Sequence, residues 1–304
     1  MNVKVNHPFL IFTMSSSEQG QTIRQFLQQL KLSKKTIHTL YMMKEVTINS
    51  EVKSFDTVLK AYDELSVLCF KAEGIDFISQ PMKLEIVYED EHLLVINKQA
   101  GIMVHPDTKN GRNTLVNGVA SYYESKQYHE RIRYIHRIDT DTSGLVIFAK
   151  HALIHPLLDD LLSKKEIKRE YVALVHGVLR RSKGLINEPI GRDRHHQARR
   201  RVTSSGDQAV THYEVLHSMG NYSIVNLRLE TGRTHQIRVH LSHIGHPLLA
   251  DELYGGQKPF KTLRRHALHA QTVRLKHPFT QQDLVMIAPI PTDLAPFMPI
   301  SSSK

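Results

Sequence analysis

The chain has 304 residues, of which 40% are hydrophobic and 23% charged, so it has room for one large globular domain and a small one. Lysine and arginine (40 residues) outnumber aspartate and glutamate (30), and the net charge of +10 favours a polyanionic partner. The single cysteine excludes an intramolecular disulfide and a cysteine-based zinc site. The sequence contains no run of about 18 apolar residues that could cross a membrane, and its first twenty residues lack the long apolar core of a signal peptide. We therefore expect a cytoplasmic protein.

Residues 12–72 are predicted to form a small α+β module. TIRQFLQQL places apolar residues three and four positions apart, as on one face of a helix. KLSKKTIHTLYMM repeats this spacing after Ser33, whose side chain can cap the helix. VTINSEV and LSVLCF predict short strands, and residues 73–83 are expected to be a linker.

Residues 84–300 are predicted to form a second, larger domain. LEIVYEDEHLLVINK indicates two strands around an acidic turn, RNTLVNGVASYYES a helix, and VTHYEVLHS with YSIVNLRLETG a hairpin. Strands outnumber helices and rarely alternate with them. We therefore expect an α+β fold, with a mainly antiparallel mixed sheet flanked by helices and loops.

The stretch HRIDTDTSGLVIFAK sets a charged turn directly against an apolar strand. A charge beside a core must be paired, solvated or used. Asp139 in this turn would be a nucleophile or a base if a cation held its carboxylate at the rim of the sheet. Alternatively, Asp139 only caps the turn through its own backbone, which Asp often does.

A second candidate segment, residues 229–248, is predicted to contain a helix that ends at Gly245, before Pro247. Arg238 lies in the middle of this helix between Ile237 and Val239, an unusual place for a free surface charge. It is the candidate partner of a buried carboxylate. The alternative is an exposed helix face.

KREYVALVHGVL alternates as a strand does, and Tyr171 begins its apolar face. A tyrosine at such a position is either part of the core or, beside a nucleobase, a ring to stack on and a hydroxyl for proton transfer.

Two features of the sequence bear on metal-dependent function: the histidines and the stretch DTDT. The 20 histidines include no HExxH or similar ligand spacing, so no metal site is expected. Residues 139–142, DTDT, are a four-residue match to the Asp-x-Asp-x-Thr signature of magnesium-dependent phosphatases. That signature follows a continuous apolar strand, whereas RYIHRI precedes these residues here. This phosphatase remains the alternative enzyme.

Taken together, these segments resemble RluA-type pseudouridine synthases. HRIDTDTSGLVIFAK resembles the catalytic segment of that family, INKQAGIMVHP the segment before it, KREYVALVHG its tyrosine strand, and ETGRTHQIRVHLSHIGHPLLADELYG its arginine helix. The resemblance spans about residues 84–291. Residues 12–72 resemble, in a degenerate form, the S-four-type RNA-binding domain that often precedes this catalytic domain.

The resemblance implies isomerisation of uridine to pseudouridine in structured RNA, with ribosomal RNA expected before transfer RNA. It makes Asp139 the nucleophile or ribose-proton acceptor, Tyr171 the stacking residue and general base, and Arg238 the ion-pair partner of Asp139. The reaction needs no oxidant, phosphate or group donor, so no cofactor is expected. A non-catalytic RNA-binding protein is the other alternative.

RNA must also be gripped on both sides of the reacting base. GRDRHHQARRRV, residues 191–202, is predicted to be a flexible basic loop that contacts phosphates; the alternative is a solvated charged loop. The full set of expected RNA-binding residues is Lys34, Lys35, His136, Arg137, Arg192, Arg199, Arg200, Arg201, Arg233, His235 and Gln236. We expect a monomer that needs no protein partner and no membrane.

Overall fold

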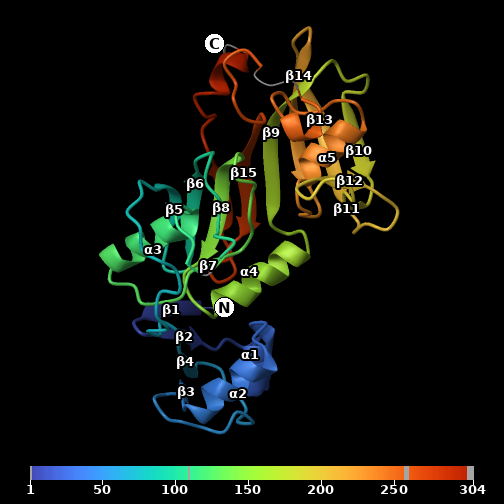
Figure 1. Ribbon diagram of the computed structural model, residues 1–304. Coiled ribbons are helices and arrows are strands. Elements are labelled where there is room, and N and C mark those ends of the chain that lie inside the picture. The colour runs from blue at the N-terminus through green and yellow to red at the C-terminus, as the bar shows by residue number, and fades with distance from the viewer. Residues whose placement is uncertain (1, 109, 257–259, 300–304) are drawn as a thin grey trace, which may run out of the picture.

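A computed structural model describes residues 2–108, 110–256 and 260–299. The chain folds into two bodies, a small one near the N-terminus and a large one built on an extended sheet (Figure 1). This α+β arrangement confirms the predicted fold class.

The N-terminal body is a four-stranded antiparallel sheet covered by two helices. In chain order its elements are β1 (Asn2–Asn6), β2 (Phe9–Thr13), α1 (Ile23–Gln29), α2 (Lys34–Met42), β3 (Val46–Ile48) and β4 (Glu64–Leu68), with the strands in the order β1-β2-β4-β3. The Ser33 side chain accepts a hydrogen bond from the Thr36 N–H and caps α2, as predicted. The β1–β2 hairpin lies largely ahead of residue 12 and was not expected.

The large sheet has the strand order β10-β13-β14-β9-β15-β8-β6-β5, with β16 beside β15 and β7 beside β8. These strands are β5 (Glu85–Glu89), β6 (Leu93–Lys98), β7 (Arg133–Tyr134), β8 (Ser143–Ala149), β9 (Lys168–His176), β10 (Lys183–Asn187), β13 (Val210–Ser218), β14 (Tyr222–Leu229), β15 (Leu268–Lys276) and β16 (Asp283–Ile287). Each of these pairings is antiparallel except β8 with β15, which is parallel. The prediction of a mainly antiparallel mixed sheet is confirmed.

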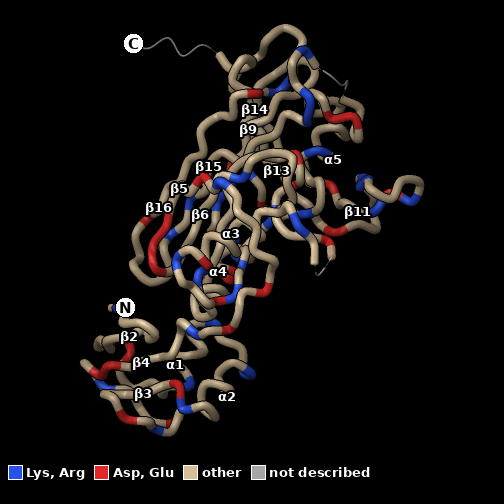
Figure 2. Tube along the Cα trace, turned by 60° about the vertical axis from the view of Figure 1, so that its left-hand side comes forward, with Lys and Arg blue, Asp and Glu red and all other residues tan. Residues whose placement is uncertain are grey.

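Helices α3 (Leu115–Ser125), α4 (Ile154–Ser163) and α5 (Gln236–His243) flank this sheet, with short 3-10 turns at Glu252–Tyr254 and Ala295–Phe297. The segment predicted to be a flexible loop is instead a two-stranded ribbon, made of β11 (Ile190–Arg192) and β12 (Arg200–Val202). Its backbone hydrogen bonds correct the loop prediction, and only the turn between the two strands is irregular. Figure 2 shows the ribbon projecting from the body, with basic residues along it.

The two bodies pack directly against each other. The rings of Phe12, on β2, and Phe279, after β15, meet edge to face with centroids 5.9 Å apart. Cys69 lies at the same junction, 3% exposed, beside Leu153. No helix in the described part of the chain is long and apolar enough to cross a membrane.

Candidate active site

Asp139 lies in a tight turn between β7 and β8, and the turn is closed by a hydrogen bond from the Thr142 N–H to the Asp139 carbonyl (3.1 Å). Gly144, at the start of β8, has φ +116°, and a Cβ there would lie 2.2 Å from the Ala270 carbonyl oxygen of β15. Only glycine permits this close approach. The turn is thereby fixed against a central strand of the sheet.

Two cations, the buried Lys98 and the half-buried Arg265, hold the backbone of the same turn. Lys98 Nζ donates to the Thr140 carbonyl (2.9 Å), and Arg265 Nη1 donates to the Asp141 carbonyl (2.9 Å). Arg265 is itself held by Asp293 through two hydrogen bonds of 2.7 and 3.1 Å. The orientation of Asp139 therefore depends on residues from distant parts of the chain, and sequence reasoning named neither cation.

Arg238 points from α5 toward the turn. Its Nη1 lies 3.2 Å from Asp139 Oδ2, while its Nε and Nη2 each donate to Asp251 at 2.8 Å. Burial alone would lower the pKa of Arg238, but the Asp251 and Asp139 carboxylates raise it, so the guanidinium stays charged. The geometry agrees with a carboxylate partner for Arg238. The stronger, bidentate partner is Asp251, which sequence reasoning missed.

His235 and Tyr254 complete this side of the site. His235 Nδ1 lies 2.8 Å from the Tyr254 hydroxyl, and His235 Nε2 lies 3.9 Å from Asp139 Oδ2. Burial lowers the pKa of His235 although Asp139 opposes this, so the ring is mainly neutral at pH 7. The Arg238 guanidinium lies 5.0 Å from the centre of the Tyr254 ring. The cation is therefore enclosed between two carboxylates and an aromatic face.

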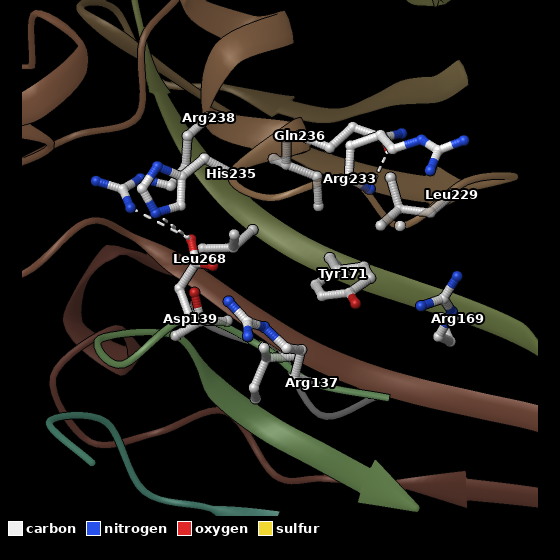
Figure 3. Close-up of a pocket in the computed structure, with 14 residues that line it drawn as sticks. Arg137, Asp139, Arg169, Tyr171, Leu229, Arg233, His235, Gln236, Arg238 and Leu268 are labelled. Carbon is white, nitrogen blue, oxygen red and sulfur yellow. Dashed lines mark hydrogen bonds and ion pairs between the residues drawn. The ribbon is translucent and has the colours of Figure 1, made fainter. Parts of the chain in front are cut away.

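Tyr171, on β9, lies across a pocket from these groups (Figure 3). Leu229, Ile237 and Leu268 give the pocket apolar walls, and Asp139 stands at its edge with its side chain 24% exposed. Burial raises the pKa of Tyr171, so its phenol is protonated at neutral pH. The pocket combines an ion-paired carboxylate with an aromatic ring, which suits a flat, uncharged base.

Two residues of the expected RNA-binding set lie inside the protein. His136 is buried, and neither ring nitrogen has a hydrogen-bond partner among the described residues; burial lowers the pKa of its ring to about 3. Gln236 is 3% exposed, and its amide donates to Val210 and Thr211 and accepts from Arg233 N–H. Neither side chain has a polar atom free to reach a phosphate. Their role as RNA contacts stays a prediction, which this buried placement does not support.

The other members of the set are at the surface or at the pocket. Arg192, Arg200 and Arg233 line one surface cavity next to it. The remaining residues are distributed as follows: Arg201 is exposed on the ribbon, Arg199 is half-buried 3.9 Å from Asp193, Arg137 is exposed 3.1 Å from His105 Nε2, His235 lines the pocket, and Lys34 with Lys35 is exposed at the start of α2. The structure thus brings arginines from the ribbon and from the loop before α5 together.

In the described ranges, no group of three or more His, Cys, Asp or Glu side chains is placed to hold a metal ion. The DTDT tetrapeptide at residues 139–142 does not end a buried parallel strand; it precedes β8 and follows the two-residue strand β7. This geometry differs from that of the phosphatase signature.

Comparisons with known proteins identify the family of the chain. A family model described as RNA pseudouridylate synthase matches residues 92–243, and one for the RluD ribosomal pseudouridine synthase N-terminal domain matches residues 10–65. The uncharacterised RNA pseudouridine synthase YhcT of Bacillus subtilis (strain 168) is 43% identical, over 92% of this chain and 93% of that protein. The ribosomal large subunit pseudouridine synthase D of Pasteurella multocida (strain Pm70) is 36% identical, over 91% of this chain and 90% of that protein.

Solved structures show the same fold. The human RNA pseudouridylate synthase domain containing 4 superposes with a TM-score of 0.58 at 25% identity, over 69% of this chain and 90% of that one. The human RNA pseudouridylate synthase domain containing 1 gives a TM-score of 0.56 at 26% identity, over 71% and 88%. The chain belongs to the RNA pseudouridylate synthase family, as a member of its RluA/RluD type, and is an enzyme that isomerises uridine in RNA.

Proposed function

We propose that this enzyme converts uridines of ribosomal RNA to pseudouridine, with Asp139 acting on the ribose of the target nucleotide. The observation that carries the proposal is the ion pair of Asp139 with Arg238 at the edge of an apolar pocket that contains Tyr171. The ribosomal target is supported by the relatives named ribosomal large subunit pseudouridine synthase D.

Asp139 acts by one of two routes. Its carboxylate either attacks C1′ of the ribose as a nucleophile or removes the C2′ proton so that a glycal forms. Arg238 orients the carboxylate in both routes, and Asp251 fixes Arg238 through its bidentate contact. The neutral state of Tyr171 suits stacking against the uracil ring. To act as the final base for the C5 proton, Tyr171 would first have to lose its phenol proton when the substrate is bound.

The base reaches Asp139 only after it leaves its stack, so the RNA on either side must be held. Arg192, Arg200 and Arg233 form an arginine cavity beside the pocket, and we assign the flanking phosphates to it. We also propose that residues 12–72 act as an RNA-contact module, joined by residues 73–83 to a catalytic domain of residues 84–300. The match of residues 10–65 to the RluD N-terminal domain supports the first part.

Asp139→Asn tests the assignment. Asparagine has nearly the same shape, but it neither attacks carbon nor accepts the proton, so tritium release from RNA carrying carbon-five-labelled uridine should stop while RNA binding persists. Asp141→Asn is the matched control, because Asp141 lies two residues away, is exposed, and contributes its carbonyl rather than its carboxylate to the turn. An Asp139→Asn protein that works near the wild-type rate would refute the assignment.

The ribosomal target has its own test. Pseudouridines are mapped in total RNA from cells with and without the gene, and we expect at least one position in ribosomal RNA to revert to uridine. Loss of pseudouridine from transfer RNA alone would overturn the ribosomal assignment and leave the chemistry intact.

A further inference from the structure

Arg169 is a buried cation in the pocket that Asp139 and Tyr171 also line. It is 8% exposed, lines the pocket, and its side chain forms no hydrogen bond or ion pair with any residue that the structure describes. Burying an unpaired charge is costly, so such a group marks a place where a ligand supplies the missing partner. The mechanism above makes no use of it.

The nearby carboxylates are engaged elsewhere. Glu230 accepts from Lys165 and His212, each at 2.6 Å, and Glu170, on the other face of β9, lies 3.6 Å from Arg274. Gly232, in the loop before α5, lies so close that a Cβ there would be 3.4 Å from Arg169 Nη1. The guanidinium is thus packed in place by backbone and left free to donate into the pocket.

The position of Arg169 relative to the proposed reacting atoms is specific. Arg169 and Tyr171 are two residues apart on β9, so both side chains leave the same face of the strand, roughly 6.6 Å apart along it. Figure 3 shows Tyr171 between Asp139 and Arg169. A uracil that stacks on Tyr171 with its ribose-bearing atom at Asp139 therefore directs its opposite edge toward Arg169.

The geometry of uracil makes this opposite edge informative. In the ring, C4 lies opposite N1 and C2 lies opposite C5, and both C4 and C2 carry a carbonyl oxygen. Before the reaction N1 faces the ribose, so O4 points away from it. After the base has turned about its N3–C6 axis, C5 faces the ribose and O2 occupies the place that O4 had.

Resting on the proposed function, we infer that Arg169 is a further catalytic residue, which binds the uracil carbonyl opposite the ribose, first O4 and then O2. In both routes the N1–C1′ bond breaks and its electron pair stays on uracil, as an anion delocalised over N1, O2 and O4. The C5–C1′ bond then forms, either as the Asp139–C1′ ester bond breaks and frees the carboxylate or as Asp139 returns the proton to C2′ of the glycal. C5 loses its proton to a base, and N1 gains a proton. Arg169 stabilises the detached anion and meets an equivalent carbonyl on both sides of the turn.

The test compares Arg169→Met with Arg169→Lys and with the control Lys168→Met, which removes an exposed lysine from the opposite face of β9. Single-turnover rates at saturating enzyme are measured on RNA with uridine or 5-fluorouridine at the target. We expect Arg169→Met to lose on the order of 10²–10³ in rate on uridine, as removal of an anion-stabilising donor does, with Arg169→Lys in between and Lys168→Met unchanged.

Fluorine withdraws electrons and stabilises the uracil anion, so the loss in glycosidic-bond cleavage should be distinctly smaller on 5-fluorouridine. A structural role predicts otherwise. Replacing an unpaired buried charge by Met should leave the Tm unchanged or raise it, whereas loss of a structural contact would lower it. Arg169→Met and Arg169→Lys each test the inference if the variant folds. A rate loss that is equal on uridine and 5-fluorouridine RNA, or no rate loss, overturns it. If the wild type itself released no tritium from any RNA, the proposed function would fail instead.

Discussion

The turn that carries Asp139 and the β11–β12 ribbon both concentrate charge beside one pocket, but they hold it in opposite ways. Beside the turn, Arg238 of α5 and Asp251 are buried and joined by two charge-assisted hydrogen bonds, and Arg238 also contacts Asp139. On the ribbon, Arg201 is exposed, and the Nε of Arg199 makes a loose contact of 3.9 Å with the Asp193 carboxylate. Paired and buried charges fix geometry, whereas exposed charges attract a polyanion without fixing it. We therefore expect the turn to control the rate and the ribbon to control affinity.

The larger effect is expected at Asp251. Asp251→Asn removes the negative charge and one of the two acceptor oxygens that hold Arg238, so that the 3.2 Å contact with Asp139 is the remaining ion pair of the buried guanidinium among the described residues. Breaking a buried pair in this way costs about 3–5 kcal/mol of folding free energy. We expect urea unfolding to show that loss and single-turnover tritium release to fall sharply, although Asp251 does not contact the base.

Asp207→Asn is the control for this change. The Asp207 side chain is exposed and lies 3.8 Å from Arg233, and an exposed ion pair contributes only about 0–1 kcal/mol. If both variants unfolded at the same urea concentration, the distinction between the buried and exposed pairs would not hold.

A smaller effect, on affinity alone, is expected on the ribbon. Replacing Arg199, Arg200 and Arg201 by Ala should weaken RNA binding and flatten its dependence on salt, by about 0.9 of log–log slope per lost phosphate contact on duplex and about 0.7 on single strands. Lys164→Ala is the control, because it removes the positive charge of an exposed lysine that follows α4 and lies outside the ribbon. Single-turnover rates at saturating enzyme should stay near wild type. A rate that fell as steeply as affinity would show that the ribbon positions the base.

Local patterns in the sequence were enough for much of the fold. Ser33 and the apolar spacing after it predicted α2 and its cap, because a helix start is determined by a few neighbouring residues. The β1–β2 hairpin was missed, since two five-residue strands give little periodicity, and β4, the strand that pairs with β2, comes more than fifty residues later. The ribbon was read as a loop because charge dominates its composition.

For the site, residues with an odd local context were found and those without one were missed. Asp139 belongs to a charged turn directly before an apolar strand, and Arg238 lies between Ile237 and Val239, so the local sequence alone makes both charges unusual. Asp251 lies in the segment LLADELYG, where an acidic residue has no unusual neighbours. Its contact with Arg238 becomes visible only in the folded structure. Arg169 follows Lys168, and their shared charge does not distinguish them, although strand alternation turns one of the two inward.

The position of Cys69 makes the junction between the two bodies measurable. Burial raises the pKa of its thiol, and the thiolate is the form that reacts, so a thiol reagent modifies it only when the junction opens. Because Cys69 is the sole cysteine of the chain, the labelling rate reports one site without any engineered probe. The same rate, followed with RNA bound and without it, measures whether substrate binding closes the N-terminal body onto the catalytic sheet.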